Sequence, residues 1–416
     1  MSASLSHALV PRGAERAIRE ALADTRVVVV HGPRQAGKST LAGGVAASLG
    51  GTTLTLDDDT VLASARQDPA AFVQRHGLLM IDEIQRAPEL FLAIKAKVDR
   101  DQTPGQFLLT GSAQILAVPH LGDSLTGRME IVELWPFSQR ELERHPGSFI
   151  DIAVAGRTLD MAPSELTKLD YLERAVTGGF PEAVRRVNAG RRDRWFDAYL
   201  TTMIQRDVAG LADIERSADL PRVLRLLAAR TATVLNVDAV ARDAAVPPTT
   251  MRRYLSLLEA TFAIQRIPAW TTSRTTRAAH APKLHVTDTG VAAHLLGANP
   301  LRLARPGQDA RPLLETFVVM ELRRQLGWSD ERVRLHHYRN RDGVEVDAVL
   351  EAADGRVVGI EVKAGSTVRA DDFRGLRQLR SMADKSFVIG IVLYTGREPL
   401  PFGDQLVALP ISSLWS

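Results

Sequence analysis

Short continuous runs of apolar residues, each ending in glycine or polar residues, characterise the first third of the chain. Such runs cover residues 27–30, 78–81 and 107–109, and apolar runs of this length are typical of strands that are buried on both faces of a parallel sheet. Apolar residues at helical spacing lie at 14–23 and 39–49. The alternation of the two patterns predicts an α/β fold built on a parallel sheet.

The middle of the chain changes to helical periodicity. Helices are expected at 164–176 and 192–211, with the turn residues Gly178-Gly179-Phe180-Pro181 between them. The stretch 235–267 contains a short helix, a tight turn, a second helix that begins at Pro248, and a strand. This order looks like a winged helix, whose second helix either enters a DNA major groove or packs as a lid or adaptor.

The last third has the order helix, three strands, helix, strand. The expected ranges are 314–326 for an amphipathic helix, 333–338, 344–350 and 357–363 for strands, 371–382 for a helix and 386–393 for a strand. We therefore expect three units. They are a nucleotide domain at 1–150, a helical and winged-helix region at 151–300, and a C-terminal α/β domain at 301–416.

A glycine-bracketed loop follows the first predicted strand and opens a helix. Its sequence fits G-x-x-x-x-G-K-[ST] at every fixed position, and such a loop directs backbone N–H groups and a helix N-terminus at phosphate oxygens. Lys38 can reach the β- and γ-phosphates of ATP, and the Ser39 hydroxyl can hold Mg²⁺. The residues expected to bind the nucleotide are Gly32, Pro33, Arg34, Gln35, Ala36, Gly37, Lys38, Ser39 and Thr40.

Two acidic residues, Asp82 and Glu83, end the second apolar strand. Paired with a phosphate loop upstream, Asp82 can hold Mg²⁺ beside Ser39, and Glu83 can polarise the water that attacks the γ-phosphate. Thr110 and Ser112 end the next apolar strand, where hydroxyls either sense the γ-phosphate or cap a loop.

Arg128 precedes the strand predicted from residue 129. It is either a surface arginine or a guanidinium for a γ-phosphate, in its own subunit or in a neighbour. A contact between Arg128 and a neighbour's γ-phosphate would imply a homo-oligomer.

The C-terminal strands carry a second candidate site. Asp347 lies on the middle strand of the three, and alternation places Glu361 and Lys363 on one face of the next strand. Two carboxylates can hold Mg²⁺, and Lys363 can position the attacking water. Combined with the order of elements, these residues resemble the PD-(D/E)xK nuclease fold, in one branch of which a glutamate at the position of Glu315 contacts the same metal.

Composition limits the partners of the chain. The formal net charge of its 416 residues is only +3, and aromatic residues make up 5%, so any nucleic-acid surface for DNA or RNA must be local. One such local cluster of basic residues, at 185–194, is either a phosphate-binding face or a solvated one. Absence of cysteine excludes disulfides and thiolate metal sites. No secretory leader or membrane-spanning run is evident, which predicts a cytoplasmic location and no membrane partner.

Several motifs together resemble one family, the AAA-type ATPases (AAA_14-like) that carry a C-terminal DUF4143 region. The motifs are the phosphate loop, residues 79–85, 109–112, 125–128 and 134–138, Gly178-Gly179-Phe180-Pro181-Glu182, Gln205-Arg206-Asp207 and Asp288-x-Gly290. The resemblance implies an ASCE-type P-loop sheet and ATPase activity, without a known substrate.

We therefore expect a Mg²⁺-dependent ATPase that couples its nucleotide state to a nucleic-acid-directed C-terminal domain, with or without nuclease activity. The alternative is a nucleotide-gated switch or scaffold that binds protein partners through a catalytically inactive nuclease-like domain. Catalytic residues under the first hypothesis are Lys38, Glu83, Arg128, Asp347, Glu361 and Lys363, and metal ligands are Ser39, Asp82, Glu315, Asp347 and Glu361.

Overall fold

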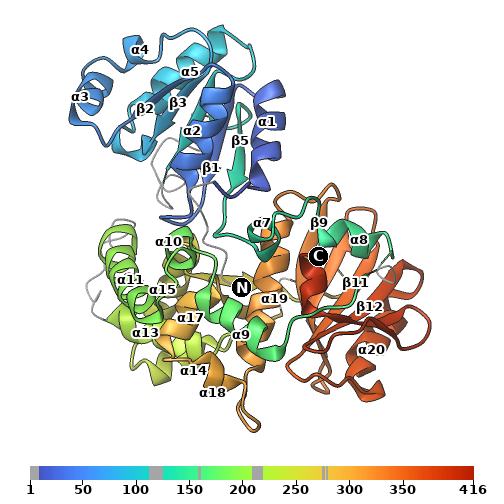
Figure 1. Ribbon diagram of the computed structural model, residues 1–416. Coiled ribbons are helices and arrows are strands. Elements are labelled where there is room, and N and C mark those ends of the chain that lie inside the picture. Colours follow the sequence, from blue (N-terminus) through green and yellow to red (C-terminus); the bar gives the residue numbers. More distant parts are fainter. Residues whose placement is uncertain (1–8, 112–124, 158–160, 209–218, 274–276, 278–279) are drawn as a thin grey trace.

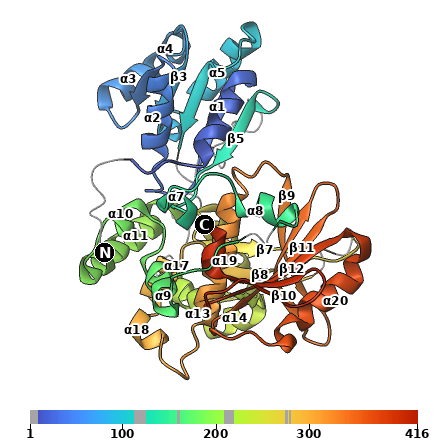
Figure 2. The same ribbon diagram turned by 45° about the vertical axis from the view of Figure 1, so that its right-hand side comes forward.

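The computed structural model describes residues 9–111, 125–157, 161–208, 219–273, 277 and 280–416. The described residues form a five-stranded, a six-stranded and a three-stranded sheet. Both views show the five-stranded sheet at the top, above the middle and C-terminal elements, which lie side by side (Figures 1 and 2).

The five-stranded sheet is parallel throughout and has the order β2-β3-β4-β1-β5. This confirms the predicted α/β fold with a parallel sheet. Its strands are β1 (Val27–His31), β2 (Thr52–Thr55), β3 (Leu79–Asp82), β4 (Phe107–Thr110) and β5 (Met129–Glu133). Its helices are α1 (Ala14–Asp24), α2 (Lys38–Ser48), α3 (Asp59–Gln67), α4 (Pro69–Phe72) and α5 (Leu90–Arg100).

Both faces of this sheet are buried, which explains why its strands are continuous apolar runs. Val27 and Val29 of β1 belong to one core cluster, together with residues of α3, α4 and α5. Val28 and Val30 face the other way and pack with residues of α1 and α2. Because side chains alternate along a strand, each face needs apolar residues at every second position.

The middle region combines helices with the three-stranded sheet β6-β8-β7. Its elements are α7 (Gln139–Leu142), α8 (Phe149–Val154), α9 (Lys168–Thr177), α10 (Pro181–Val184), α11 (Ala189–Thr202), a π-helix (Met203–Val208), α13 (Leu220–Ala229), β6 (Thr233–Val234), α14 (Val237–Asp243), α15 (Pro248–Ala260), β7 (Ile264–Ile267), β8 (Lys283–Val286), α17 (Thr289–Leu295) and α18 (Pro300–Leu303). The helix expected at 192–211 is thus shorter, because its regular winding gives way to the π-helix at Met203.

The C-terminal sheet has the order β13-β14-β12-β11-β10-β9. Its core includes the three strands and the later strand expected from the sequence. The elements are α19 (Arg311–Gln325), β9 (Val333–Arg339), β10 (Glu345–Ala352), β11 (Val357–Lys363), α20 (Arg374–Ala383), β12 (Phe387–Tyr394), β13 (Leu400–Pro401), β14 (Leu406–Pro410) and a 3₁₀-helix (Ile411–Leu414). Residues of α8 and α19 pack on one face of this sheet, and residues of α20 pack on the other.

The prediction that the helix beginning near residue 314 is amphipathic is wrong. In α19, side chains are buried on nearly all sides, including those of Glu315 and Glu321. The helix lies between the C-terminal sheet and the helices α9 and α17. It therefore has no solvent face, and its acidic residues need partners inside the protein.

One hydrophobic cluster extends from Phe149 to Trp415 and includes residues of both the middle and the C-terminal elements. Tyr171 of α9 shows how closely the two are joined. Its hydroxyl donates to Ser412 Oγ at 3.2 Å, and its ring packs edge-on against Trp415 with centroids 6.1 Å apart. Among the described residues, no helix has the length and apolar character needed to cross a membrane.

Candidate nucleotide site and C-terminal carboxylate cluster

The loop between β1 and α2 has the backbone that its glycines predict. Gly37 has a φ of 95°, in the left-handed region that favours glycine. A Cβ at Gly32 would lie 2.0 Å from the carbonyl oxygen of Leu134, so only glycine fits there. The loop leads directly into α2, so the N-terminus of this helix lies at the loop.

Lys38 is buried against its own loop. Its ammonium donates to the carbonyl oxygens of Gly32 at 3.1 Å and Pro33 at 2.8 Å. Burial lowers the pKa of Lys38 to about 8, although the nearby carboxylate of Glu83 acts in the opposite direction. An anion such as a phosphate would compensate the buried charge more fully than carbonyl oxygens do.

Ser39 at the start of α2 meets Asp82 and Thr110, which end the strands β3 and β4. Ser39 Oγ donates to Asp82 Oδ1 at 2.7 Å, and Thr110 Oγ1 donates to the same carboxylate oxygen. This set of hydroxyl and carboxylate oxygens fits Mg²⁺, which prefers hard oxygen ligands. Thr110 therefore lies beside Asp82, whereas Ser112 lies outside the described residues.

Glu83 follows β3 with a φ of 56°, a left-handed conformation that is unusual for a residue other than glycine. Its carboxylate is half-buried and accepts a hydrogen bond from Gln85 Nε2. Strained backbone of this kind is often found at functional sites, where the surrounding structure holds it in place.

Two residues that support the loop were not predicted from the sequence as contacts. Arg34 of the loop pairs with Asp207 of the π-helix, with Nη2 3.1 Å from Oδ1. Arg12 donates to the carbonyl oxygens of Ala36 at 2.8 Å and Trp135 at 2.6 Å, and its Nε donates to Glu141 at 3.0 Å. The motif Gln205-Arg206-Asp207 gave a signal for the first contact; Arg12 belongs to no motif.

The structure does not place Arg128 at its own nucleotide site. Arg128 precedes β5, whose first residue Met129 pairs with Val27 at the start of the parallel strand β1. The phosphate loop follows the opposite end of β1, so the length of the strand separates the two. Arg128 instead pairs with Asp99 of α5, with Nη2 3.0 Å from Oδ2. A contact with a neighbouring subunit's nucleotide stays a prediction.

The C-terminal candidate residues do lie together. Asp347, Glu361 and Lys363 line one cavity of about 340 Å³, together with Arg311 from α19. Lys363 Nζ lies 3.0 Å from Glu361 Oε1. Burial and the nearby charge of Asp347 raise the pKa of Glu361 to about 8.

The metal set expected at this second site is not formed as predicted. Lys283 of β8 inserts its ammonium between Glu315 and Asp347, 2.9 Å from Asp347 Oδ1 and in contact with Glu315. Among the residues that the structure describes, no group of three or more His, Asp or Glu side chains is arranged to hold a metal ion. Glu315, Asp347 and Glu361 therefore do not fit Mg²⁺ in this arrangement, because a lysine ammonium already occupies the space between two of them.

Burial and neighbouring charges define the protonation states around Lys283. Burial alone would lower the pKa of Lys283, but Asp347 and Glu315 outweigh it and raise that pKa above its usual value. Burial and the charge of Asp347 raise the pKa of Glu315 well above its usual range. The pKa of Asp347 is lowered, because Lys283 overcomes the effect of burial. The dominant pair is thus a charged Lys283 beside a charged Asp347.

The sequence contained a weak signal for Lys283. Lys283 and His285 alternate with Leu284 and Val286, and all four are buried. A lysine at the start of an apolar strand is usually exposed, so this pattern by itself does not indicate a buried ion pair. What buries it is the C-terminal sheet, which no local pattern reveals.

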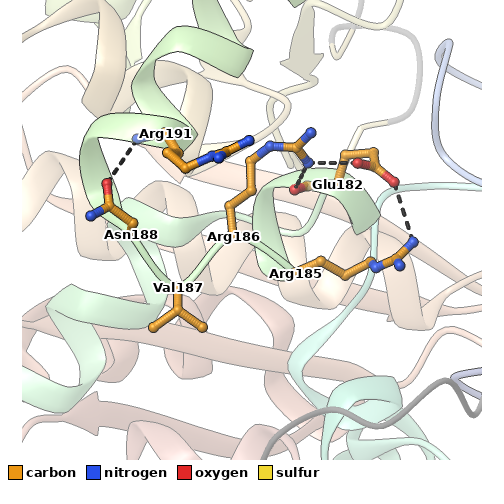
Figure 3. A pocket seen from close by; sticks show the side chains of 6 residues that line it. All are labelled: Glu182, Arg185, Arg186, Val187, Asn188 and Arg191. Atoms are coloured by element: carbon orange, nitrogen blue, oxygen red, sulfur yellow. Dashed lines mark hydrogen bonds and ion pairs between the residues drawn. The ribbon is translucent and has the colours of Figure 1, made fainter.

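A basic surface hollow of about 460 Å³ lies at the start of α11. Figure 3 shows Arg185 and Arg186 both directed at Glu182, and Asn188 capping the backbone of Arg191. Glu182 therefore partly neutralises Arg185 and Arg186, two of the arginines in the basic cluster at 185–194.

The motifs Gly178-Gly179 and Asp288-x-Gly290 form one buried junction. Asp288 Oδ2 accepts the N–H of Gly179 at 2.7 Å and lies 3.2 Å from Arg324 Nη2, while Oδ1 accepts the N–H of Gly290 at 3.0 Å. Gly179 in turn accepts the N–H of Phe137 at 2.7 Å. The junction joins α9, α17 and α19 to the segment that leaves the five-stranded sheet.

Family models match three consecutive parts of the chain. Residues 24–143 match a model described as an AAA domain, residues 168–302 match a domain of unknown function (DUF8612), and residues 311–414 match another (DUF4143). Among solved structures, the walker-type ATPase PABY2304 of Pyrococcus abyssi is similar, with 15% identity and a TM-score of 0.43 over 71% of this chain and 98% of that one. The RuvB Holliday junction branch migration motor of Thermotoga maritima is also similar, with 19% identity and a TM-score of 0.29 over 61% of this chain and 89% of that one.

Two relatives are similar along almost the whole chain. They are the uncharacterized proteins Rv2008c of Mycobacterium tuberculosis and Mb2031c of Mycobacterium bovis. Each is 30% identical over 405 residues, which cover 97% of this chain and 84% of the relative. In this chain, residues that match an AAA domain precede the residues that match the two domains of unknown function. The chain belongs to the family of these two mycobacterial proteins.

Proposed function

We propose that this protein binds and hydrolyses ATP with Mg²⁺ at the phosphate loop and passes its nucleotide state to the rest of the chain. The observation that carries the proposal is the 2.7 Å hydrogen bond between Ser39 Oγ and Asp82 Oδ1, beside the buried ammonium of Lys38. The match of residues 24–143 to an AAA domain supports the same activity.

Each residue of the site has a distinct role in this proposal. The backbone N–H groups of the loop and the N-terminus of α2 bind the phosphates, and Lys38 neutralises the β- and γ-phosphates. Glu83, held by Gln85, accepts a proton from the attacking water. Thr110 keeps Asp82 in position by donating to its carboxylate. Mg²⁺ would be held by Ser39 and Asp82 and would neutralise phosphate charge.

Three contacts around the phosphate loop favour coupling to the middle region. Arg34 pairs with Asp207 of the π-helix. His31 at the end of β1 packs against Phe262 with ring centroids 4.7 Å apart, and Trp135 packs against the same phenylalanine at 5.0 Å. A movement of the loop on binding phosphate would therefore act directly on the residues before β7 and on the π-helix.

Replacing Lys38 tests this function. Lys38→Ala should abolish ATP hydrolysis and weaken ATP binding, because the ammonium that neutralises the β- and γ-phosphates is lost. Lys97→Ala is a matched control, since Lys97 is also buried in the same domain and donates to the backbone carbonyls of Val73 and Arg75. Normal hydrolysis by a folded Lys38→Ala protein would contradict the proposal.

For the C-terminal domain we propose a likeness to PD-(D/E)xK nucleases, and for the region that contains residues 235–267 a winged helix. The first is supported by the order of α19, β9, β10, β11, α20 and β12 and by the meeting of Asp347, Glu361 and Lys363 at one cavity. The second is supported by the order of α13, β6, α14, α15, β7 and β8 and by the exposed side chains of Thr249, Arg252 and Arg253 on α15.

Two roles for this pair of units compete. In one, they bind DNA or RNA and the carboxylates cleave it; in the other, they form a scaffold that responds to the nucleotide without cleavage. The ammonium of Lys283 between Glu315 and Asp347 favours the second role. Incubation with single-stranded, duplex and branched DNA and with RNA, using Asp347→Ala as control, distinguishes them. Cleavage lost in the variant would support the first role.

A further inference from the structure

Lys283 reaches the carboxylate cluster from a different sheet. It begins β8 of the three-stranded sheet, whereas Asp347 and Glu361 lie on β10 and β11 of the C-terminal sheet and Glu315 lies on α19. The side chains of Lys283, Glu315 and Asp347 are 3%, 1% and 6% exposed. The three ionisable groups are thus enclosed by protein and must satisfy one another.

The carboxylate oxygens divide into partnered and unpartnered ones. Asp347 Oδ1 accepts from Lys283 at 2.9 Å, and Oδ2 accepts the N–H of Val362 at 2.9 Å. Glu361 Oε1 accepts from Lys363 at 3.0 Å. In the described part of the chain, both oxygens of Glu315 and Oε2 of Glu361 are buried without a hydrogen-bond partner, and Glu315 Oε1 forms an ion pair with Lys283.

The ammonium of Lys283 occupies the space in which a metal ion would bridge Glu315 and Asp347. Mg²⁺ binds its ligands at about 2.0–2.1 Å in near-octahedral geometry. An ammonium 2.9 Å from Asp347 Oδ1 and in contact with Glu315 prevents a cation from bridging these two carboxylates. The cavity beside Asp347 reaches Glu361 and Lys363, but Lys363 and Arg311 there add positive charge.

We propose that the ammonium of Lys283 takes the place of a divalent cation among Glu315, Asp347 and Glu361, so that the C-terminal domain binds no metal ion. The cluster then works as a buried charge clamp that fastens β8 to β10 and α19. The proposal rests on the proposed nuclease-like character of the C-terminal domain and is independent of ATP hydrolysis.

Binding of Mn²⁺ to the nucleotide-free protein, followed by electron paramagnetic resonance, tests the proposal without relying on activity. Wild type and Glu361→Gln should bind the same number of Mn²⁺ ions, because the cluster holds none in either. Asp82→Asn identifies any ion bound at the phosphate loop. An ion that wild type and Asp82→Asn bind, but Glu361→Gln does not, would overturn the proposal.

Removing the ammonium should reverse this behaviour. In Lys283→Met the carboxylates lose their cation, so we expect a lower melting temperature and one additional bound Mn²⁺ that raises it. The double variant Lys283→Met/Asp347→Asn should not bind this ion. A folded Lys283→Met protein with an unchanged melting temperature and no response to Mn²⁺ would contradict the clamp. If Lys283→Met does not fold, the comparison of wild type with Glu361→Gln still decides.

Discussion

Arg34 and Asp207 join the phosphate loop to the π-helix by a forked ion pair. Arg34 Nε lies 3.2 Å and Nη2 3.1 Å from Asp207 Oδ1, and Nε lies 3.3 Å from Oδ2. The Asp207 side chain is 4% exposed, whereas that of Arg34 is 29% exposed. Since the loop is the proposed phosphate site, a bound γ-phosphate would compete with Asp207 for the same guanidinium.

We predict that Asp207→Asn tightens ATP binding. The neutral amide holds Arg34 less strongly, which makes the guanidinium available to phosphate. A partly exposed ion pair contributes about 1 kcal/mol, which corresponds to about a fivefold lower Kd. Titration with a fluorescent ATP analogue measures this change. In an Arg34→Ala background the same substitution should have no effect, and an unchanged Kd in the single variant would show that Arg34 does not contact the nucleotide.

Glu83→Gln should retain ATP and stop hydrolysis. The amide keeps the shape and the contact with Gln85 but cannot accept a proton from water, a loss of about 10²–10⁴-fold in rate. Single-turnover hydrolysis and nucleotide retention on a desalting column measure the two effects. Glu89→Gln, a partly exposed glutamate on the same segment, serves as control. Hydrolysis by Glu83→Gln at the wild-type rate would show that Glu83 is not the general base.

ATP binding should take up a proton near pH 8. The pKa of Lys38 is lowered by burial to about 8 in the free protein, and the phosphates favour the charged form, which raises this pKa on binding. At pH 8 about half of the free protein carries a neutral Lys38, so about half a proton is taken up, and much less at pH 6.5. Calorimetric titrations in buffers of different ionisation enthalpy measure the uptake. Proton uptake that is equal at both pH values would show that Lys38 is not the group that becomes protonated.

Asp288→Ala should strongly destabilise the protein. Asp288 accepts backbone hydrogen bonds from Gly179 and Gly290 and pairs with Arg324, whose side chain is 3% exposed. Removing one partner of a buried pair costs about 3–5 kcal/mol. Urea unfolding measures the loss. Asp238→Ala is the control, because the side chains of Asp238 and its partner Arg252 are both exposed. Exposed ion pairs contribute about 0–1 kcal/mol. Equal losses of unfolding free energy in both variants would show that the junction at Asp288 stabilises the protein no more than an exposed ion pair does.

The sequence predicted the parallel sheet and the residues around the phosphate loop because their signals are local. Continuous valines in β1 and the fixed spacing of Gly32, Gly37 and Lys38 each depend on a few neighbouring residues. The meeting of Ser39 with Asp82 follows from the rule that carboxyl ends of parallel strands lie at one edge. The same rule, applied to Arg128, places it at the opposite edge, beyond reach of its own phosphate loop.

Contacts between distant segments were not predictable in this way. Lys283 and Asp347 are 64 residues apart, and Arg34 and Asp207 are 173 residues apart. A charged residue at a strand end carries no local sign of which sheet will cover it. The burial of α19 on nearly all sides was missed for the same reason, because its sequence pattern shows polar residues that find partners inside the protein.

The packing of Tyr171 against Ser412 and Trp415 has a consequence for synthesis of the chain. Ser412 leaves the ribosome 241 residues after Tyr171, so the core around α9 stays open until nearly the whole chain has been made. The five-stranded sheet needs no residue beyond β5 to complete its strand order and can close much earlier. A nascent chain stalled before residue 411 should therefore resist protease over the AAA domain and remain sensitive around α9.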